Sequence, residues 1–438
     1  MNAESLASDP GSIALAGSRL ASKSTTARDL VDASLARIAI VDARVQGWCS
    51  IDRQGARTEA SVLDDEAARG QLRGPLHGIP VAIKDVIDVA RWPTRAGSAT
   101  REHVPPATSD AQIVAVLRAA GAVILGKAHT TEFAYFDGPP PTRNPHNLAH
   151  TPGGSSAGPA AVVAAGMVPL SVGTQTAGSV SRPAAYCGIA AYKPSTQSWS
   201  AHGIVPFAPG FDTPGLFAHR VADVAIAARA LMPAFLVRPV AAPQTTLRVG
   251  ILEDPVLEAS SAAVTDSIRA ASEKIAAAGH SVAPTRSPAP LAKITDWHKI
   301  MIEYELARVH PQLADAPTAD VTPALRDAVL RGRAISDSTY IEARRAIDQA
   351  RDSFWSALHS FDALVFPAAP DGAPVGVKTG DPRFIVPFTA FGGPIISVPI
   401  AMTGERLPLG LMLLGAPGSD WQLLHVSEQL APAIELAR

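Results

Sequence analysis

Apolar runs and an amphipathic segment alternate early in the chain, and this pattern constrains the fold more than any other feature. Residues 78–86 are an apolar run that leads into polar residues, which predicts a short buried strand. Ser109 and Asp110 are expected to cap the next helix, which stops at Gly121. Residues 122–125 then predict a second strand. A strand, a helix and a strand in succession are typical of an α/β fold.

The same architecture extends toward both ends of the chain. Residues 9–45 have a mostly helical pattern, in which Thr26 and Asp29 stand at the spacing of a capping box. Residues 297–345 are expected to form a helical cover that shapes a pocket. Further strands are predicted at residues 247–252, 363–366, 395–399 and 409–414.

Composition indicates a folded protein without an obvious charged partner. Of the 438 residues, 47% are hydrophobic and 18% are charged, so a large core can be buried. The formal net charge of -2 provides no basic field for phosphate backbones or anionic lipid. We therefore expect neither a nucleic-acid partner nor a membrane partner.

Targeting signals and cysteine usage favour a cytoplasmic location. Residues 1–17 lack the basic start and long apolar core of a signal peptide. Residues 157–173 are apolar but short and broken by prolines, so they are interpreted as a core helix rather than a membrane span. Cys49 and Cys187 have no metal-site spacing and are interpreted as buried thiols in a reducing compartment.

The first segment that suggests chemistry is GIPVAIKD, residues 78–85, in which Lys84 ends an apolar strand. Burial disfavours an ammonium group, so a lysine there can act as a neutral base near pH 7. The alternative is a structural lysine that reaches water or pairs with Asp85 or Asp88.

The second segment is TPGGSSAG, residues 151–158, which runs directly into a stretch of alanines and valines. Small residues allow close approach of the backbone to a reacting group, and a helix start offers free N–H donors. A phosphate-cradling loop or a merely flexible one is the alternative.

The third segment is GTQTAGS, residues 173–179, continued by VSRPAAYCG to residue 188. A serine that follows small residues can present its hydroxyl while the N–H groups of the turn face a substrate oxygen. An ordinary turn is the alternative for this segment taken alone.

Together these segments resemble the amidase signature family, whose core reads approximately GIPxxxKD, GGSSGG and GTDxGGSIRxPAxxCG. The two family serines are matched in separation, since 179 − 155 = 24 positions. The resemblance implies one α/β domain over residues 1–438, with a mixed, mostly parallel central sheet covered by helices on both faces. It places the catalytic signature core at residues 61–225 and a variable, mainly helical part that lines the cleft at 240–375.

The resemblance also assigns roles to residues. It implies that Lys84 is the general base, that Ser155 is a bridging serine with a cis peptide, and that Ser179 is the nucleophile. It implies no metal, nucleotide or flavin. The backbone N–H groups expected to hold the oxyanion belong to Thr176, Ala177, Gly178 and Ser179.

The chain departs from the family pattern around the nucleophile. Gln175 stands where the family has Asp, and Ala177 where it has Gly. Ser181 replaces the family's Arg, and Arg182 follows one place later. These changes are expected to remodel the hydrogen bonds behind the site. Ala157 replaces a glycine after the serine pair and is expected to stiffen that turn.

An apolar or aromatic acyl group is the expected substrate feature, and ordinary core packing is the alternative. Phe133, Tyr135 and Phe136 follow the strand that borders the site in the family, and Gly154 lies beside the bridging serine. The same catalytic trio suits amides and carbamates, so the sequence predicts a small amide or carbamate as substrate.

Two other functions stay open. The chain resembles the amidase subunit of a tRNA-dependent amidotransferase, which would hydrolyse glutamine and pass ammonia to a partner. It could also be a non-catalytic homologue used for assembly. Homodimers are common in the family, and a homodimer is a further expectation.

Some residues suggest functions that the sequence does not favour. Residues 121–127 fit the opening of a P-loop, but Ala128 replaces the Ser or Thr that Mg²⁺ needs. His129 or His202 could serve Ser179 in a Ser-His-Asp triad. Two acidic residues are interpreted as caps or turn residues rather than catalytic acids, namely Asp212 and Asp223.

Overall fold

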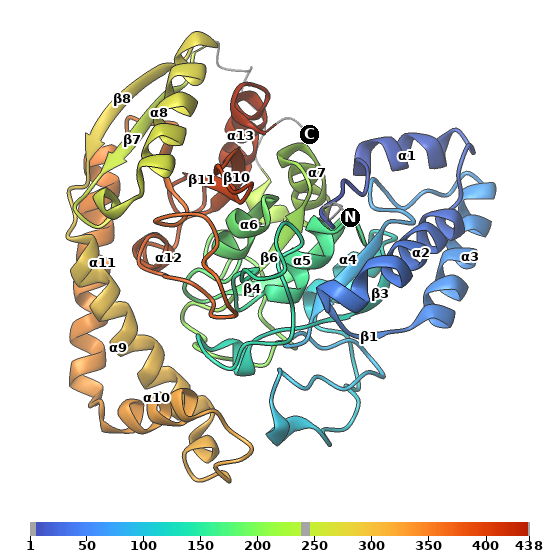
Figure 1. The fold of residues 1–438 in the computed structure, drawn as a ribbon, viewed down its shortest axis with the longest axis horizontal. Helices are drawn as coiled ribbons and strands as arrows, with labels where there is room; N and C mark the ends of the chain where they lie inside the picture. The colour runs from blue at the N-terminus through green and yellow to red at the C-terminus, as the bar shows by residue number, and fades with distance from the viewer. Residues whose placement is uncertain (1–5, 238–245, 437–438) are drawn as a thin grey trace.

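A computed structural model describes residues 6–237 and 246–436, and the strands within them form one continuous sheet (Figure 1). The strand order is β1-β3-β2-β4-β6-β5-β10-β11-β9-β7-β8. The strands are β1 (Trp48–Ile51), β2 (Pro80–Lys84), β3 (Val123–Ala128), β4 (Leu170–Gln175), β5 (Ala190–Lys193), β6 (Thr213–Ala218), β7 (Arg248–Glu253), β8 (Ser281–Arg286), β9 (Ala363–Pro367), β10 (Ile395–Met402) and β11 (Pro408–Leu414).

The sheet is mixed, as expected. β2 pairs in parallel with β3 and β4, and β7 pairs in parallel with β8 and β9. Antiparallel pairs join β1 to β3 and run from β4 through β6, β5, β10 and β11 to β9. Parallel pairing therefore predominates, as expected, around β2 and around β7. The strands from β4 through to β9, in the centre of the sheet, pair in antiparallel orientation. A short connection of the kind between β10 and β11 produces antiparallel neighbours.

Helices cover both faces of the sheet, which confirms that part of the expected fold. One buried cluster joins α2 (Ala27–Val45), α3 (Arg53–Ala68) and α5 (Ala157–Ala164) to one face. A larger cluster occupies the other face. Its helices include α4 (Gln112–Ala119), α7 (Val221–Leu231), α8 (Ala262–Ala277), α9 (Leu291–Val309), α10 (Pro323–Ala334), α11 (Asp337–Leu358), α12 (Val386–Ala390) and α13 (Asp420–Ile434).

The alternation of side chains along β2 directs Lys84 toward α5. Val81 and Ile83 belong to the larger cluster, whereas Ala82 belongs to the cluster that contains α5. Residues two apart on a strand share a face, so Lys84 lies on the same side as Ala82. The strand thus carries the lysine to the segment that precedes α5.

The helix predicted over residues 157–173 is too long. α5 ends at Ala164, and Gly166 adopts a positive φ of 69° that terminates the helical run. Leu170–Gln175 is strand β4. A continuous apolar run does not distinguish a buried helix from a buried strand by periodicity, which explains the error.

Some of the other local predictions are confirmed and some are wrong. The capping box of Thr26 and Asp29 is present at the start of α2. Asp110 does not cap α4, because its carboxylate accepts hydrogen bonds from the Ala90 N–H and from Arg118 instead. Cys187 is buried as expected, but Cys49 is exposed. Cys49 lies on β1, at the edge of the sheet, where one flank has no neighbouring strand.

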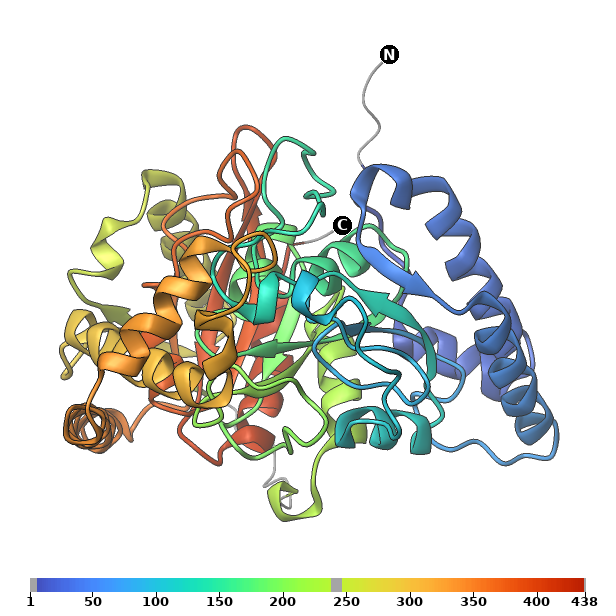
Figure 2. The ribbon, with the colours of Figure 1, turned by 90° about the horizontal axis from the view of Figure 1, so that it is seen from below.

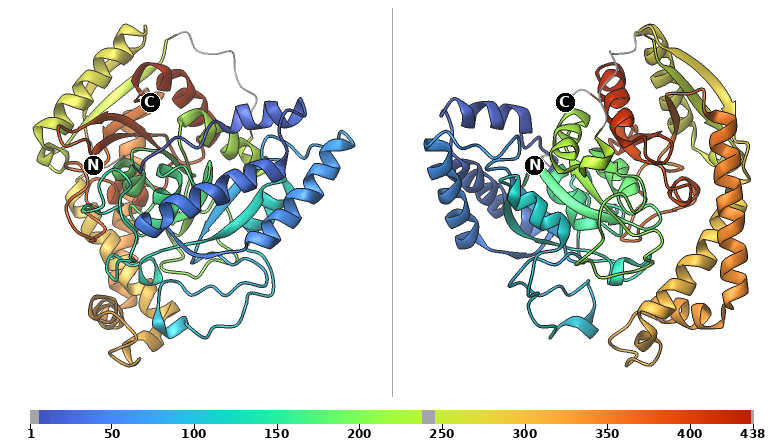
Figure 3. Two further views of the ribbon diagram at one scale, coloured as in Figure 1. Left: turned by 45° about the vertical axis from the view of Figure 1, so that its right-hand side comes forward. Right: turned by 180° about the vertical axis from the view of Figure 1, so that it is seen from behind.

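The C-terminal half adds both strands and helices to this core. β7, β8 and β9 extend the sheet, while α10 and α11 each pack against α9. These three helices lie on the side of the molecule opposite α2 and α3 (Figures 1, 2 and 3). None of the described helices is both long and apolar enough to cross a bilayer.

Candidate active site

Lys84 lies at the end of β2 with its side chain fully buried. Its Nζ donates a hydrogen bond to Oγ of Ser155 at 2.7 Å and another to Oγ1 of Thr174 at 2.8 Å. Burial lowers the pKa of Lys84 to about 7, against the opposing effect of the Asp212 carboxylate. A substantial fraction of this amine is therefore neutral near pH 7.

Asp85 does not pair with Lys84. Its Oδ1 lies 3.0 Å from Nζ of Lys127 on the adjacent strand β3. Lys127 is buried and also donates a hydrogen bond to Oγ1 of Thr94 at 3.1 Å. The interpretation of Lys84 as the ion-pair partner of Asp85 is therefore wrong. The P-loop-like segment that ends at Lys127 is strand rather than a phosphate-binding loop.

The two serines before α5 make different contacts. The Gly154–Ser155 peptide bond is cis, the form that the resemblance implied. Ser155 accepts the hydrogen bond from Lys84. Ser156 instead fastens this loop to β4, because its Oγ donates to the Thr174 carbonyl at 3.2 Å and accepts from the Thr174 N–H at 3.3 Å. A Cβ on Gly173 would come within 2.6 Å of this hydroxyl, so only glycine allows the approach.

Ser179 is buried in the turn between β4 and α6 (Ser181–Cys187). The side chain of Gln175 organises this turn. Its Oε1 accepts hydrogen bonds from the N–H groups of Val180 and Ser181, both at 2.9 Å. The amide therefore holds the backbone immediately after Ser179 against the end of β4.

Arg182 ties the Ser179 turn to the Ser155 loop. Its guanidinium is fully buried, and Nη2 donates a hydrogen bond to the Gly154 carbonyl at 2.7 Å. Burial lowers the pKa of Arg182. This arginine, which stands one place later than the arginine of the family pattern, thus links the segments that carry the two serines.

The segment before Ser179 is held from three sides. Thr176 donates its hydroxyl proton to Oδ1 of Asp212 at 2.5 Å. Nε2 of His298 lies 2.9 Å from the Thr176 carbonyl. Burial lowers the pKa of His298 to about 4, so the ring is neutral and Nε2 donates to this carbonyl. Thr389 donates its hydroxyl to the Ala177 carbonyl at 2.5 Å.

These contacts leave the backbone donors of the segment uncommitted. In residues 6–237 and 246–436, the N–H groups of Thr176, Ala177, Gly178 and Ser179 make no hydrogen bond. Unpaired N–H groups in a buried turn are suited to a negatively charged oxygen. The arrangement is thus chemically compatible with an oxyanion hole.

Gln175 explains how the site accommodates one departure from the family. Besides accepting two backbone hydrogen bonds, it donates through Nε2 to Oγ1 of Thr389 at 2.9 Å. An aspartate can accept but not donate when ionised. The glutamine therefore makes one hydrogen bond that an ionised aspartate could not make, and this bond connects Thr389 of α12 to the turn around Ser179.

A cavity of about 670 Å³ opens beside these residues. Tyr135, Phe136 and Val386 supply apolar parts of its lining, and His298 and Thr379 supply polar parts. A Cβ on Gly154 would lie 2.6 Å from Cγ2 of Thr379, so the Ser155 loop abuts this wall directly. The cavity therefore lies next to both the Ser155 loop and the Thr176 segment.

Of the three aromatic residues predicted to contact substrate, two line the cavity and one lies in the core. Tyr135 and Phe136 line the cavity. Phe133 is buried away from that lining, and its ring packs against the His310 ring at a centroid distance of 4.7 Å. Its position therefore agrees with the alternative of ordinary core packing.

The residues considered for other roles lie elsewhere or act structurally. Across the part of the chain that the structure describes, no hydrogen bond joins Ser179 to His129 or His202, and His202 is exposed. Asp212 accepts from Thr176 and from the N–H groups of Phe207 and Ala208. Asp223 caps α1 (Ile13–Ala21) by accepting the Ile13 N–H at 2.8 Å.

Sequence reasoning missed three residues of this arrangement. Thr174 lies inside a motif that was identified, but its contact with Lys84 was not anticipated. His298 and Thr389 come from α9 and α12, and no local pattern marks either residue. Their partners are 122 and 212 positions away in the chain, so only the fold reveals them.

The fold and the motifs of this site are those of the amidase family. The sequence model of the family described as Amidase matches residues 29–424, and the chain belongs to that family.

Curated relatives and solved structures agree with this assignment. One subunit of the glutamyl-tRNA(Gln) amidotransferase of Salinispora arenicola is 32% identical, with 94% of each chain covered. A solved amidase structure shares 30% identity and a TM-score of 0.87, covering 97% of this chain and 100% of its own. The peptide amidase of Stenotrophomonas maltophilia shares 28% identity and a TM-score of 0.86, covering 98% and 97% respectively.

Proposed function

We propose that this protein hydrolyses the C–N bond of a small apolar or aromatic amide or carbamate through an acyl-enzyme on Ser179. The contact between Nζ of Lys84 and Oγ of Ser155 at 2.7 Å carries the proposal. In this contact a buried amine with a pKa of about 7 meets the hydroxyl of Ser155. Ser179, the proposed nucleophile, is buried as well. Such an amine is a competent general base near neutral pH.

The proposed proton route uses both serines. Neutral Lys84 takes the proton of Ser155 while Ser155 takes the proton of Ser179, whose Oγ attacks the carbonyl carbon. The route then runs backward and protonates the departing nitrogen as the C–N bond breaks. Water attacks the acyl-enzyme by the same route and releases a carboxylic acid from an amide, or a carbonic acid monoester from a carbamate.

The turn before α6 would stabilise the charge that develops on the carbonyl oxygen. The uncommitted N–H groups of Thr176, Ala177, Gly178 and Ser179 are the proposed donors. Each well-placed donor lowers the barrier by about 3 kcal/mol. His298, Asp212 and Thr389 bind the same segment through its carbonyl and hydroxyl groups, which supports a fixed orientation for the N–H groups.

The neighbouring cavity supports the proposed substrate class. Tyr135, Phe136, Ile302 and Val386 provide apolar surface within a volume of about 670 Å³. Burial of an apolar group contributes binding free energy in proportion to the area removed from water. A compact aryl or alkyl group on the acyl side suits this apolar part of the lining, and charged side chains that include Glu303, Arg331 and Lys378 line the rest.

Covalent labelling and a substrate panel test the proposal. A fluorophosphonate probe should label the wild-type protein and fail to label Ser179→Ala, while the neighbouring Ser181→Ala variant keeps full labelling. Turnover of p-nitroanilides, acetanilides and small carbamates then identifies the substrate class. Full labelling of Ser179→Ala would reject the nucleophile, and an absence of labelling in the wild type would favour a non-catalytic homologue.

A second candidate function rests on one specific similarity. The amidotransferase subunit of Salinispora arenicola is 32% identical over 94% of this chain. In that function the same three residues would hydrolyse glutamine and deliver ammonia to a partner. Co-purification with a partner subunit and glutamine hydrolysis that depends on tRNA would favour it. Efficient turnover of acetanilides by the isolated chain would favour the first proposal.

A further inference from the structure

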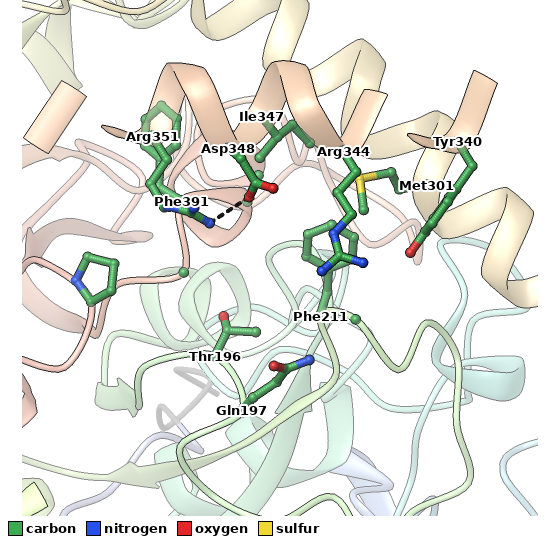
Figure 4. A pocket seen from close by; sticks show the side chains of 14 residues that line it. Thr196, Gln197, Phe211, Met301, Tyr340, Arg344, Ile347, Asp348, Arg351 and Phe391 are labelled. Carbon is green, nitrogen blue, oxygen red and sulfur yellow. Dashed lines mark ion pairs between the residues drawn. The ribbon is translucent and has the colours of Figure 1, made fainter. Parts of the chain in front are cut away.

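A second cavity, of about 300 Å³, lies beside α9 and α11 (Figure 4). Met301 of α9 and Ile347 of α11 line it, together with Phe211 and Phe391. The rings of Phe211 and His298 are in contact, with centroids 4.6 Å apart. His298 lines the first cavity and Phe211 the second, so this pair of rings forms part of the wall between them.

Arg344, an exposed residue of α11, supplies a positive charge to the lining of this cavity. It makes no ion pair with any residue in the described ranges 6–237 and 246–436. The other charged groups of the lining are Asp348 and Arg351, which pair with each other at 2.8 Å. Figure 4 shows this pair as a dashed line and the Arg344 guanidinium directed into the open space.

The Glu305 carboxylate makes no ion pair with Arg344 within the described residues, although the two charges interact. Glu305 accepts hydrogen bonds from the Gly210 N–H at 2.7 Å and from the Tyr340 hydroxyl at 2.8 Å. Both of its oxygens are thus already engaged at the rim of the cavity. Burial raises the pKa of this carboxyl group, against the opposing effects of these hydrogen bonds and of the Arg344 charge.

Thr196 contributes a polar group that has no hydrogen-bond partner among the residues that the structure describes. Its Oγ1 is buried and has no hydrogen-bond partner in the described part of the chain, although its backbone N–H donates to the Gly392 carbonyl at 2.9 Å. Burial of an unpaired hydroxyl is costly, so such groups call for an explanation. In Figure 4 the side chains of Thr196 and Gln197 lie across the cavity from Arg344.

We propose that this cavity is a second binding site, and that it takes a small organic carboxylate with a compact apolar body. A carboxylate accepts charge-assisted hydrogen bonds from a guanidinium and further hydrogen bonds from a hydroxyl or an amide. Arg344, Thr196 and Gln197 provide these groups together, while Phe211, Met301 and Phe391 provide apolar surface. A volume of about 300 Å³ is at the lower end for small-molecule sites.

The location gives such a site a connection to the catalytic segment. Phe211 directly precedes Asp212, which binds Thr176, and Phe391 closely follows Thr389, which binds Ala177. A ligand in the cavity therefore rests on the segments that hold the proposed oxyanion donors. The binding proposal itself does not depend on the chemistry of Ser179.

Calorimetric titration of the full-length protein with benzoate tests the site. Benzoate is expected to bind in a saturable manner, and Arg344→Gln is expected to weaken it about tenfold, because a charged hydrogen-bonding partner is lost. Arg345→Gln changes the adjacent exposed arginine of α11, which is outside the lining, and should leave the affinity unchanged. Lys378→Gln removes an exposed lysine of the first cavity and should also have no effect.

A second variant protects the test against misfolding. Thr196→Val keeps the shape of the side chain and removes a hydroxyl that has no partner in the described part of the chain. It should preserve the melting temperature and weaken benzoate several-fold. The proposal is overturned if wild-type protein shows no saturable binding, if Arg344→Gln and Arg345→Gln have equal effects, or if Lys378→Gln abolishes binding. Equal affinity for benzyl alcohol would overturn it as well, since the charge would then not be recognised.

Discussion

Lys84 and Lys193 occupy equivalent situations in two regions of the sheet, yet we propose only Lys84 as a general base. Each is the last residue of its strand, β2 or β5, and each is fully buried. Burial lowers the pKa of both to about 7, against the opposing charge of Asp212 in one region and of Asp420 in the other. A depressed pKa therefore does not by itself distinguish a base from a structural lysine.

The partners of the two amines make the difference. Nζ of Lys84 contacts two hydroxyl oxygens, whereas Nζ of Lys193 donates to the Pro194 carbonyl at 2.6 Å. A hydroxyl can give and accept a proton, but a carbonyl oxygen has no proton to give. Burial sets the basicity of these amines, and the contacting group decides whether a proton can move.

Substitution of the two lysines provides the strongest test of this comparison. Lys84→Met is expected to lower kcat/KM about 10³- to 10⁴-fold because it removes the proposed base. Lys193→Met should leave kcat/KM within about twofold, as expected for substitutions outside a catalytic group. Steady-state hydrolysis of the best substrate, normalised to folded protein, measures both. Equal losses in the two variants would mean that buried charge, rather than the hydroxyl contact, limits activity.

The pH dependence sharpens the assignment of the base. The reaction needs neutral Lys84, so kcat/KM should fall as pH decreases through about 7, roughly tenfold for each further pH unit. The profile should be the same in Lys193→Met, although Lys193 also has a pKa of about 7. If the step in the profile disappeared when Lys193 is replaced, the titrating group would be Lys193 rather than Lys84. That result would contradict the proposal.

Removal of the second hydroxyl at Lys84 should have a smaller effect. Thr174→Val leaves Ser155 as the hydrogen-bonding partner of the amine and is expected to lower kcat about tenfold, since one positioning hydrogen bond is lost. The loss of an acceptor also disfavours the ammonium form, so the step in the pH profile should move to lower pH. A profile displaced to higher pH would show that Thr174 does not stabilise the charged amine.

The smallest effect on activity, and a measurable effect on stability, is expected at Lys193. Lys193→Met removes a buried ammonium and should raise the free energy of unfolding at pH 6 by about 2 kcal/mol. The folded pKa is about 7 and the ordinary value is 10.5, so the unfolded chain binds the proton more tightly. The free energy of unfolding of the wild type should therefore rise as pH increases from about 7 to 10.5. The difference in free energy of unfolding between the variant and the wild type should shrink over the same range. Denaturant unfolding at several pH values measures this difference, and a constant advantage would contradict it.

Local patterns predicted much of the fold but not its pairing. The strands at β2, β3, β7, β9, β10 and β11 and the capping box of α2 were predicted because short apolar runs and capping residues are local properties of the sequence. Residues 157–173 were assigned to one helix because an apolar run lacks a period that separates α5 from β4. The role of Asp110 was misjudged because its partners, Ala90 and Arg118, lie outside the local motif.

The candidate site shows the same division. The three motifs, together with the family resemblance that they carry, identified Lys84, Ser155 and Ser179, because these motifs are features of the chain itself. They did not identify His298 or Thr389, because a helix residue with no special neighbours carries no local signal.

The amino-acid sequence by itself determined which reactive side chains the protein contains and the alternation of strands and helices on which they lie. It also determined that the chain belongs to the amidase family. Only the tertiary structure decided that Asp85 neutralises Lys127, that Lys84 meets two hydroxyls, and that Lys193 meets a carbonyl. Ser155 and Thr174 lie 71 and 90 positions from Lys84 in the chain. Contacts across such separations form when strands pair and helices pack, so the environment that gives a buried amine its chemistry is a property of the fold.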